Sequence, residues 1–341
     1  MNSTLYKRTH VLLRSGLRHL ILFVLAIATT LASADGFDYA LKPQRIADDT
    51  WVLVGRSEDF TIANGANIVN TAFVVTGAGV VVIDSGPSRY YGEQFRQAIA
   101  SVTAEPIVKV LITHYHPDHF LGNQAFALET LHALPDTISG IARDGNAFAE
   151  NLYRLSGDAM HGTEVRVPPK AITPGQFTVG THRFEVLALD GHTGADLALF
   201  DLGTGVLFTG DLVFNGRAPT TPHARIEPWL ASLERLDALG ARIIVPGHGA
   251  VSEAMPASQQ GKPASSPHVS IAQTRDYLRW LNATLKEAAE QGLDMSEALA
   301  LPLPPQIQRM AVSASEFRRS VSHLYPAAEQ DALTHAHSHR Y

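Results

Sequence analysis

The chain has 341 residues, of which 45% are hydrophobic and 18% charged, and its formal net charge is −6. This length and composition suit one large globular domain, with or without an appendage, and exclude an intrinsically disordered chain. The sequence contains no cysteine, so disulfides and thiolate metal ligands are excluded. Its negative charge argues against a nucleic-acid partner, because an acidic surface repels phosphate groups.

Residues 1–34 have the pattern of a secretory signal peptide. Four basic residues precede the apolar stretch from Leu20 to Leu31, and the small-residue pattern Ala32-Ser33-Ala34 follows it. The apolar stretch is shorter than the ~20 residues that a membrane span needs, so we predict cleavage after Ala34 and no stable membrane span. Cleavage would remove four cations and no acidic residue, which brings the formal charge to −10. The mature protein is therefore predicted to be periplasmic or secreted.

The elements predicted for the N-terminal half run from strands to a helix and back to a strand. Strand patterns occupy residues 49–55 and 71–86, the second as a hairpin around residues 76–79. A helix with Phe95 and Ile99 on one face follows, and then the buried strand PIVKVLIT. A strand, a helix and a strand in this order predict a crossover unit.

The second half repeats this order. Strand patterns at 182–191 and 197–211 are followed by a helix in which Trp229, Leu233 and Leu236 recur at helical spacing, and then by the short strand ARIIVPGH. Two mixed halves of similar order predict two sheets that pack face to face with helices outside. We assign this core to residues 35–255.

The composition changes after the core. Residues 256–268 are rich in proline and serine and are predicted to be a connector. An amphipathic helix that carries Tyr277, Leu281 and Leu285 on one side follows. Residues 269–341 are therefore predicted to form a helical C-terminal extension and tail.

Titratable side chains crowd the end of the strand PIVKVLIT. Within six positions the sequence places His114, His116, Asp118 and His119. Unpaired polar groups at the end of a buried strand are costly, so something must compensate them. If the backbone is extended, the histidines at 114 and 116 point the same way, whereas Pro117 turns the chain before the other two. This window predicts a loop that serves two cations.

One loop cannot complete two coordination shells, so further donors are expected at other strand ends, where open α/β folds build their sites. Three candidates each follow an apolar strand and sit beside a glycine, namely His192, Asp211 and His248. Glycine lets neighbouring backbone approach closely. We therefore expect four loops to converge on one metal site.

These residues resemble the metallo-β-lactamase-fold superfamily, whose H-x-H-x-D-H signature is matched by His114, His116, Asp118 and His119. The resemblance covers about residues 45–250. It implies an α/β fold, an αβ/βα four-layer sandwich, here followed by the helical C-terminal extension.

The resemblance also implies a ligand set for two zinc ions. The first zinc would take His114, His116 and His192, the second would take Asp118, His119 and His248, and Asp211 would bridge them. Asp84, in the early turn "DSG", resembles a family carboxylate that supports the ligand loop from behind. Iron or manganese would also accept such a set of histidines and carboxylates.

Details within the superfamily favour one branch. True β-lactamases usually lack a bridging aspartate and several use cysteine, whereas this chain has Asp211 and no cysteine, which favours the glyoxalase-II-like branch. Flavodiiron oxidases place glutamate where this chain has His116. The stretch GANIVNTAFVV, residues 191–236 and the exported start are most similar to the quinoprotein relay system zinc metallohydrolases (SoxH-like). That likeness implies a role beside a periplasmic quinoprotein dehydrogenase system.

The implied activity is hydrolysis of a small-molecule substrate. Two zinc ions ~3.5–4 Å apart would share a water and lower its pKa toward ~7, so that a metal-bridging hydroxide cleaves an acyl bond of the thioester or ester type, or a related bond. Asp118 would be the catalytic residue that orients this hydroxide and relays its proton. Two alternatives are a non-haem iron sulfur dioxygenase-like enzyme, which uses a single metal, and a non-catalytic, metal-dependent binding module.

Three residues are candidates for contact with the substrate. Tyr115 stands between two of the expected ligands, and its alternative is packing in the core. His223 is predicted to contact an anionic substrate or to reinforce the site. Arg217 has the same candidate role, with a surface salt bridge as the favoured alternative. The segment 146–162 would cover the cleft, unless it only packs as an ordinary amphipathic helix.

Overall fold

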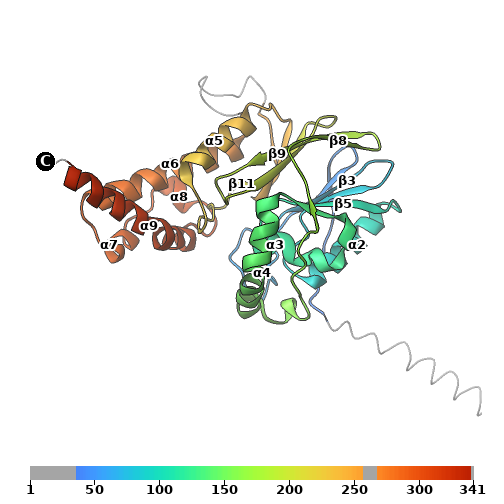
Figure 1. Ribbon diagram of the computed structural model, residues 1–341, viewed down its shortest axis with the longest axis horizontal. Coiled ribbons are helices and arrows are strands. Elements are labelled where there is room, and N and C mark those ends of the chain that lie inside the picture. Colours follow the sequence, from blue (N-terminus) through green and yellow to red (C-terminus); the bar gives the residue numbers. More distant parts are fainter. Residues whose placement is uncertain (1–35, 256–266, 339–341) are drawn as a thin grey trace, which may run out of the picture. The chain divides into compact units, whose positions relative to one another are not determined.

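Each half of the described chain builds one β-sheet (Figure 1). The computed structural model describes residues 36–255 and 267–338, so the predicted signal peptide and residues 256–266 of the predicted connector lie outside the described residues. The first sheet is antiparallel over its first four strands and parallel from β4 onward. Its strands, in spatial order, are β1 (Gln44–Ala47), β2 (Thr50–Leu53), β3 (Thr71–Val75), β4 (Val80–Ile83), β5 (Ile107–Ile112), β6 (Leu131–Ala133) and β7 (Lys170–Ala171).

The second sheet has six strands, and only β11 and β12 pair in parallel among the pairs described. In spatial order its strands are β13 (Ser252–Glu253), β12 (Ile243–Gly249), β11 (Val206–Asn215), β10 (Asp196–Asp201), β9 (His182–Leu189) and β8 (Gly175–Val179). Every strand predicted for the second half is present. Strands β1, β6, β7, β8 and β13 were not predicted.

The described helices are α2 (Arg89–Val102), α3 (Pro117–Phe120), α4 (Pro135–Ser156), α5 (Ile226–Asp237), α6 (Val269–Glu290), α7 (Met295–Leu299), α8 (Pro305–Gln308) and α9 (Ser313–Ser338), with short 3-10 turns η1 (Leu121–Ala125), η2 (Leu128–Thr130) and η3 (Gly157–Met160). Helices α2 to α5 lie between strands in the sequence, and α6 to α9 follow the last strand. The side chain of Ser88 caps α2 by accepting a hydrogen bond from the backbone of Tyr91. Because α2 joins the parallel strands β4 and β5, the predicted crossover unit is confirmed.

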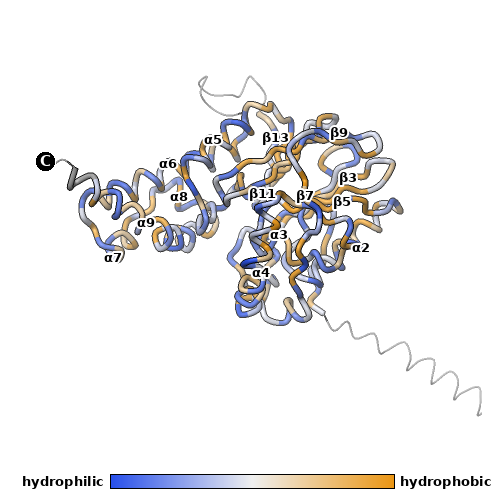
Figure 2. Tube along the Cα trace, in the orientation of Figure 1, coloured by the Kyte–Doolittle hydropathy of each residue, from blue (hydrophilic) through white to orange (hydrophobic). Residues whose placement is uncertain are grey.

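Strand β4 shows how the layers form. Val81 and Ile83 face a core that also contains Phe208 and Val245 of the second sheet. Val80 and Val82 point the other way, into a core closed by α2 and α4. Because side chains alternate along a strand, one apolar run serves both faces. The order is therefore helices, sheet, sheet, helices, which confirms the predicted four-layer sandwich; Figure 2 shows the strands as its most hydrophobic segments.

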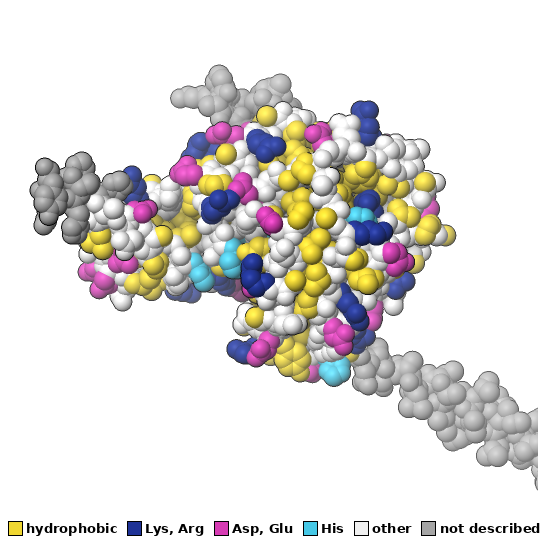
Figure 3. Space-filling model, viewed as in Figure 1, with side chains coloured by type: hydrophobic (Ala, Val, Ile, Leu, Met, Phe, Trp, Pro, Cys, Tyr) yellow, Lys and Arg dark blue, Asp and Glu magenta, His cyan; other side chains and the backbone are white. Residues whose placement is uncertain are grey.

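The C-terminal helices share a core with the second sheet. Leu207 of β11 and Trp229 of α5 are buried in one cluster with Leu281 of α6 and Val321 of α9. This packing agrees with the predicted helical extension, while the domain boundaries themselves stay predictions. Within the described ranges, no helix is long and apolar enough to cross a membrane. On the face drawn in Figure 3, basic and acidic side chains are interspersed.

Candidate metal centre

Seven buried side chains meet where strands of both sheets end. Four come from the loop after β5 and from α3, one follows β9, and two lie on β11 and β12. They form two groups, within each of which the nearest ligand atoms all lie within 4.8 Å of one another. The first group is His114, His116, His192 and Asp211, and the second is Asp118, His119 and His248. These are the seven residues that the sequence pointed to; their role as metal ligands remains a proposal.

Asp211 lies between the two groups. Its Oδ2 is 3.3 Å from His192 Nε2 in the first group and 3.2 Å from His248 Nε2 in the second. Its Oδ1 is 3.2 Å from His119 Nε2. The strand that carries Asp211 is irregular at this point, and Gly210 has a φ of 49°. Such an irregularity re-aims a side chain, and here the Asp211 carboxylate lies between imidazoles of both groups.

The donor atoms fit divalent metal ions. Four of them are buried and have no hydrogen-bond partner among the described residues: His114 Nε2, His119 Nε2, Asp118 Oδ2 and Asp211 Oδ1. Leaving a buried polar atom unpaired costs about 1–3 kcal/mol. Metal ions would compensate all four, and a set of imidazoles and carboxylates is one that zinc, iron and manganese accept.

Burial keeps the imidazoles of the first group neutral. It lowers the pKa of His192 to about 3, and it lowers the pKa values of His114 and His116 well below the usual histidine value. A histidine must be deprotonated to bind a metal ion. These three side chains are therefore in the form that a metal requires across the physiological pH range.

Asp211 and His119 behave as a charged pair. Burial alone would raise the pKa of Asp211, but the imidazoles of His248 and His119 hold it well below its usual range. Burial alone would lower the pKa of His119, but the carboxylates of Asp211 and Asp84 raise it well above the usual value. These carboxylates favour the protonated form of His119, whereas metal binding requires the deprotonated form.

Asp84 supports His119 from behind, as the resemblance implied. Its Oδ2 lies 2.7 Å from His119 Nδ1, and its two oxygens accept hydrogen bonds from the backbone and hydroxyl of Thr113 at 2.8 and 2.9 Å. The backbone of Asp84 has a φ of 58°, in the left-handed region that non-glycine residues rarely adopt. Such local strain is typical of functional positions. Because Asp84 contacts Nδ1 of His119, the other ring nitrogen, Nε2, faces the metal centre.

His248 is supported by the stretch GANIVNTAFVV, to which the sequence assigned no role in the site. Its Nδ1 lies 2.7 Å from the carbonyl oxygen of Ile68. Two residues further on, the side chain of Asn70 donates to the carbonyls of Pro246 and Gly249, at 2.9 and 2.7 Å, and accepts from the backbone of Gly55. One amide side chain therefore pins the backbone on both sides of His248.

Replacing Asn70 with alanine should destabilise the protein by about 3 kcal/mol, because three buried backbone groups lose their partners. It should also weaken metal binding, since the backbone around His248 is released. Chemical denaturation and metal titration of the same preparation measure both effects. The control is Asn67→Ala in the same loop, because Asn67 Oδ1 has no hydrogen-bond partner among the described residues. Equal stability of the two variants would contradict this account.

The turn that presents His192 depends on Asp196, which was not among the residues predicted for the site. Thr193 donates to the carboxylate of Asp196 from its backbone, at 2.9 Å, and from its hydroxyl, at 2.8 Å. Burial raises the pKa of Asp196 to about 7. The only signal in the sequence was an acidic residue in the glycine-containing turn HTGAD, which by itself indicates no more than a loop.

His223 lies against the first group. Its Nδ1 is 2.9 Å from His116 Nε2, while His116 Nδ1 is 2.8 Å from His192 Nε2. His116 can therefore offer Nδ1 to a metal ion while its other nitrogen is held by His223. Of the five candidate ligand histidines, only His192 has a second nitrogen without a partner among the described residues.

Replacing His223 with alanine should weaken metal binding by about 10–100-fold, the usual effect of losing the partner behind a ligand histidine. His223→Gln retains a hydrogen-bond acceptor and should recover part of the affinity. Competition with a chromogenic chelator measures both variants against the wild type. Wild-type affinity in His223→Ala would show that this contact does not orient His116.

Tyr115 packs in the core, as its alternative predicted, and also lies beside the first group. Its ring is only 8% exposed and belongs to the core closed by α2 and α4. The same ring lies 5.4 Å from the rings of His116 and His223 and is stacked 6.1 Å from Phe148. These aromatic rings form a wall beside the first group. Contact between Tyr115 and a substrate stays a prediction.

Arg217 is not on the surface, so the favoured alternative was wrong. It is 2% exposed, and its Nη2 lies 3.1 Å from Glu316 Oε1 of α9, which is fully buried. Its other hydrogen bonds go to Ala218 and Thr220. The guanidinium therefore serves an internal ion pair, and we withdraw it as a substrate contact. The sequence suggested a surface position because arginine is rarely buried unless it is paired.

The segment expected to cover the cleft belongs to α4 and η3. Phe148 of this segment reaches the rings of Tyr115, His116 and His223. Tyr153 is 49% exposed, and Arg154 pairs with Glu150 on the surface. The segment thus packs as an amphipathic helix, with Phe148 at the aromatic wall.

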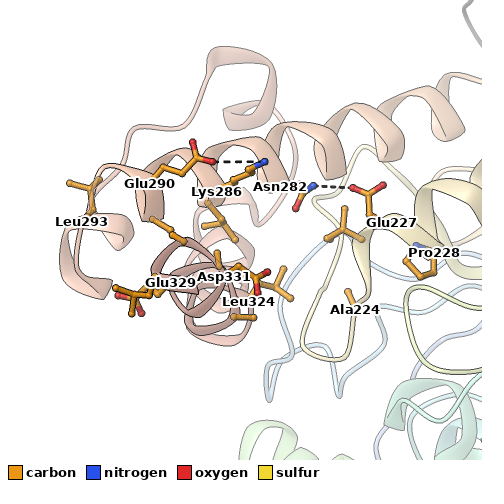
Figure 4. Close-up of a pocket in the computed structure, with 18 residues that line it drawn as sticks. Ala224, Glu227, Pro228, Asn282, Lys286, Glu290, Leu293, Leu324, Glu329 and Asp331 are labelled. Carbon is orange, nitrogen blue, oxygen red and sulfur yellow. Dashed lines mark hydrogen bonds and ion pairs between the residues drawn. The ribbon is translucent and has the colours of Figure 1, made fainter. Parts of the chain in front are cut away.

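A groove of about 1140 Å³ lies between α5, α6 and α9 (Figure 4). Leu285, Leu293 and Leu324 line its apolar part. On its rim Lys286 pairs with Glu290, and Asn282 donates to Glu227. None of the seven candidate ligands lines this groove, so it is distinct from the metal centre.

Comparison with known sequences gives a family match over the metal centre. The sequence model of the metallo-beta-lactamase superfamily matches residues 64–248, which include all seven candidate ligands. The chain is 31% identical over 187 residues to atrochrysone carboxyl ACP thioesterase of Aspergillus fumigatus, covering 54% of this chain and 52% of that protein. It is 25% identical over 220 residues to the acyl-coenzyme A thioesterase MBLAC2 of Homo sapiens, covering 58% of this chain and 71% of that protein.

The fold has relatives among solved structures. A metallo-beta-lactamase from Pontibacter korlensis aligns with a TM-score of 0.54 and 20% identity, over 70% of this chain and 99% of that one. This likeness concerns the fold alone. The chain spans about half the length of several curated relatives that it matches.

Proposed function

The chain belongs to the metallo-beta-lactamase superfamily, and from this premise we propose that it is a dinuclear, metal-dependent hydrolase that cleaves acyl thioesters or related esters. Zinc is the metal we propose, with iron or manganese as the alternatives that the same ligands accept. The relatives named as thioesterases support the substrate class. The likeness that suggested the glyoxalase-II-like branch points the same way.

One observation carries the proposal that two metal ions bind side by side. The Asp211 carboxylate is within 3.3 Å of His192 in the first group and of His119 and His248 in the second. A carboxylate with one group of imidazoles on either side is the arrangement that a bridging ligand requires. Two ions held by these residues would activate a water and polarise the substrate carbonyl.

The residues of the chain have separate roles in this reaction. Asp118 Oδ2 is buried, lies 3.4 Å from His248 Nε2 and accepts no hydrogen bond among the described residues. It can therefore take the proton of the attacking water and pass it to the leaving thiolate or alkoxide. Thr113 and Asp84 hold His119 in place, and the aromatic wall of Tyr115, Phe148 and His223 gives an apolar acyl group a surface to pack on.

We further propose that the enzyme is exported and serves a periplasmic quinoprotein dehydrogenase system. The basic and apolar pattern of residues 1–34 supports export. The likeness of residues 191–236 to quinoprotein relay system metallohydrolases supports the partner. Detection of the processed chain in the periplasmic fraction would test export directly, and an unprocessed cytoplasmic chain would refute it.

Hydrolysis of a substrate panel tests the activity. We expect the metal-loaded protein to cleave acyl thioesters faster than β-lactams or sulfate esters. A strong chelator should abolish the activity, because none of the candidate ligands could activate the attacking water without the ions. Added zinc should restore the activity. Turnover that survives complete metal removal would refute the proposal. Oxygen uptake with persulfide substrates would instead support the dioxygenase alternative.

A further inference from the structure

Helix α9, which is coloured red in Figure 1, contacts two loops that are distant from each other in the sequence. One loop runs from Gly216 to His223, and the other runs from Arg56 to Ile68. Each loop ends on a residue that touches a different candidate ligand histidine. His223 holds His116 of the first group, and the carbonyl of Ile68 holds His248 of the second.

The first contact of α9 is with the loop that carries His223. Glu316 Oε1 accepts hydrogen bonds from Arg217 Nη2 at 3.1 Å and from the hydroxyl of Thr220 at 2.8 Å. The Thr221 hydroxyl donates to Ser320 Oγ at 2.7 Å. Just before α9, the backbone of Ala311 pairs with this loop by two hydrogen bonds, to Gly216 and from Ala218. Four bonded residues therefore stand within six positions of His223.

The second contact of α9 is with the loop that leads to Ile68. Ser315 Oγ donates to Asp59 Oδ2 at 2.7 Å, and Arg319 Nη2 donates to Asp59 Oδ1 at 3.3 Å. The backbone carbonyl of Asp59 accepts from the side chain of Asn64, whose own oxygen accepts from the backbone of Ala66, two residues before Ile68. The loop is thus hydrogen-bonded from α9 almost to Ile68.

A single ion-pair network joins both contacts. Arg319 Nη1 lies 2.6 Å from Glu316 Oε1, so one arginine binds both Glu316 and Asp59. Glu316 is fully buried between two arginines, Arg217 and Arg319. Buried pairs of this kind favour one arrangement over others, because breaking them leaves an uncompensated charge.

We propose that the residues of α9 between Ser315 and Ser320 form a brace that positions both metal-ligand groups at once. This inference rests on the proposed function, since it concerns the same centre. It makes the C-terminal helices part of the catalytic unit, although α9 supplies no candidate ligand among the described residues. Glu316, Arg319, Ser315 and Ser320 act as positioning residues through His223 and Ile68.

The test uses the full chain with the double substitution Ser315→Ala and Thr221→Val. Each change removes one hydroxyl from one contact of the brace and leaves every charge in place, so the protein should fold. Stepwise zinc affinities are measured by chelator competition. We expect both steps to weaken by about tenfold, the lower end of the usual effect of disturbing the residues behind ligand histidines. When Thr221→Ser replaces Thr221→Val in the double variant, a hydroxyl is retained at this position, and the zinc affinity of the first group should recover.

Two controls separate positioning from general destabilisation. Ser322→Ala removes an exposed hydroxyl from the same helix and should bind zinc as the wild type does. Leu285→Val removes one buried methylene group from the core that α6 helps to form. It should lower the unfolding midpoint without changing the zinc affinity. Wild-type affinity at both steps in the double variant would overturn the brace. A wild-type chain that binds no zinc would instead overturn the proposed function.

Discussion

Replacing Gly247 with alanine should abolish metal binding and hydrolysis. A β-carbon at this position would lie 1.9 Å from Asp211 Oδ1 and 2.7 Å from the backbone carbon of Gly210. Gly210 is backbone in a β-strand and cannot move away, so the Asp211 carboxylate between the two ligand groups has to yield. The carboxylate must therefore leave its position between the imidazoles. Elemental analysis and the thioester assay measure the result.

The matched control is Gly194→Ala in the loop that presents His192. A β-carbon there would meet no atom within 4 Å, so metal content and activity should stay near wild-type values. If Gly247→Ala retained both metal ions and full activity, the position of Asp211 would not matter and the bridging role would be wrong. Circular dichroism of both variants verifies that the chain still folds.

The second large effect is expected from Asp118→Ala. Loss of a positioned group that transfers protons lowers the rate by about 10²–10⁴-fold, and Asp118 is also a candidate ligand of the second group. We therefore expect hydrolysis to fall below detection in a standard assay, mainly through kcat. Rates are compared at matched metal content, so that lost occupancy and lost proton transfer are distinguished.

A suitable control for this change is Asp136→Ala. Asp136 also follows a proline at the start of a helix, but it is exposed on α4. Its loss removes the same charge from the same kind of position, but Asp136 is not a candidate ligand. The activity should therefore be unchanged. Hydrolysis by Asp118→Ala at the wild-type rate and full metal content would rule out the proposed proton transfer.

The candidate ligands could be predicted because they stand in the sequence at or soon after the end of an apolar run. A histidine or aspartate after a buried strand is visible in one sequence, and four such positions in different loops predict convergence. The layers could be predicted for the same reason, since runs such as VVVI in β4 are buried on both faces. The short strands at the sheet edges, β1, β7 and β13, have too little apolar pattern to be recognised.

Asp84 and His223 were predicted behind the ligands, but which ligand each supporting residue holds could not be predicted, because the partners are distant in the sequence. Asn70 and Gly249 are 179 positions apart, and His116 and His223 are 107 apart. Arg217 illustrates the same limit, since its partner Glu316 lies 99 positions away. Without that partner the sequence favours a surface arginine. Only the folded chain shows that this charge is buried and paired.

The metal content of the purified, full-length protein tests the central claim most directly. After exposure to excess zinc and removal of unbound ions, we predict close to two zinc ions per folded chain, and at most one in an Asp211→Ala variant that still folds. A folded wild-type chain that retains no divalent metal ion, or an Asp211→Ala variant that still retains two, would contradict the account.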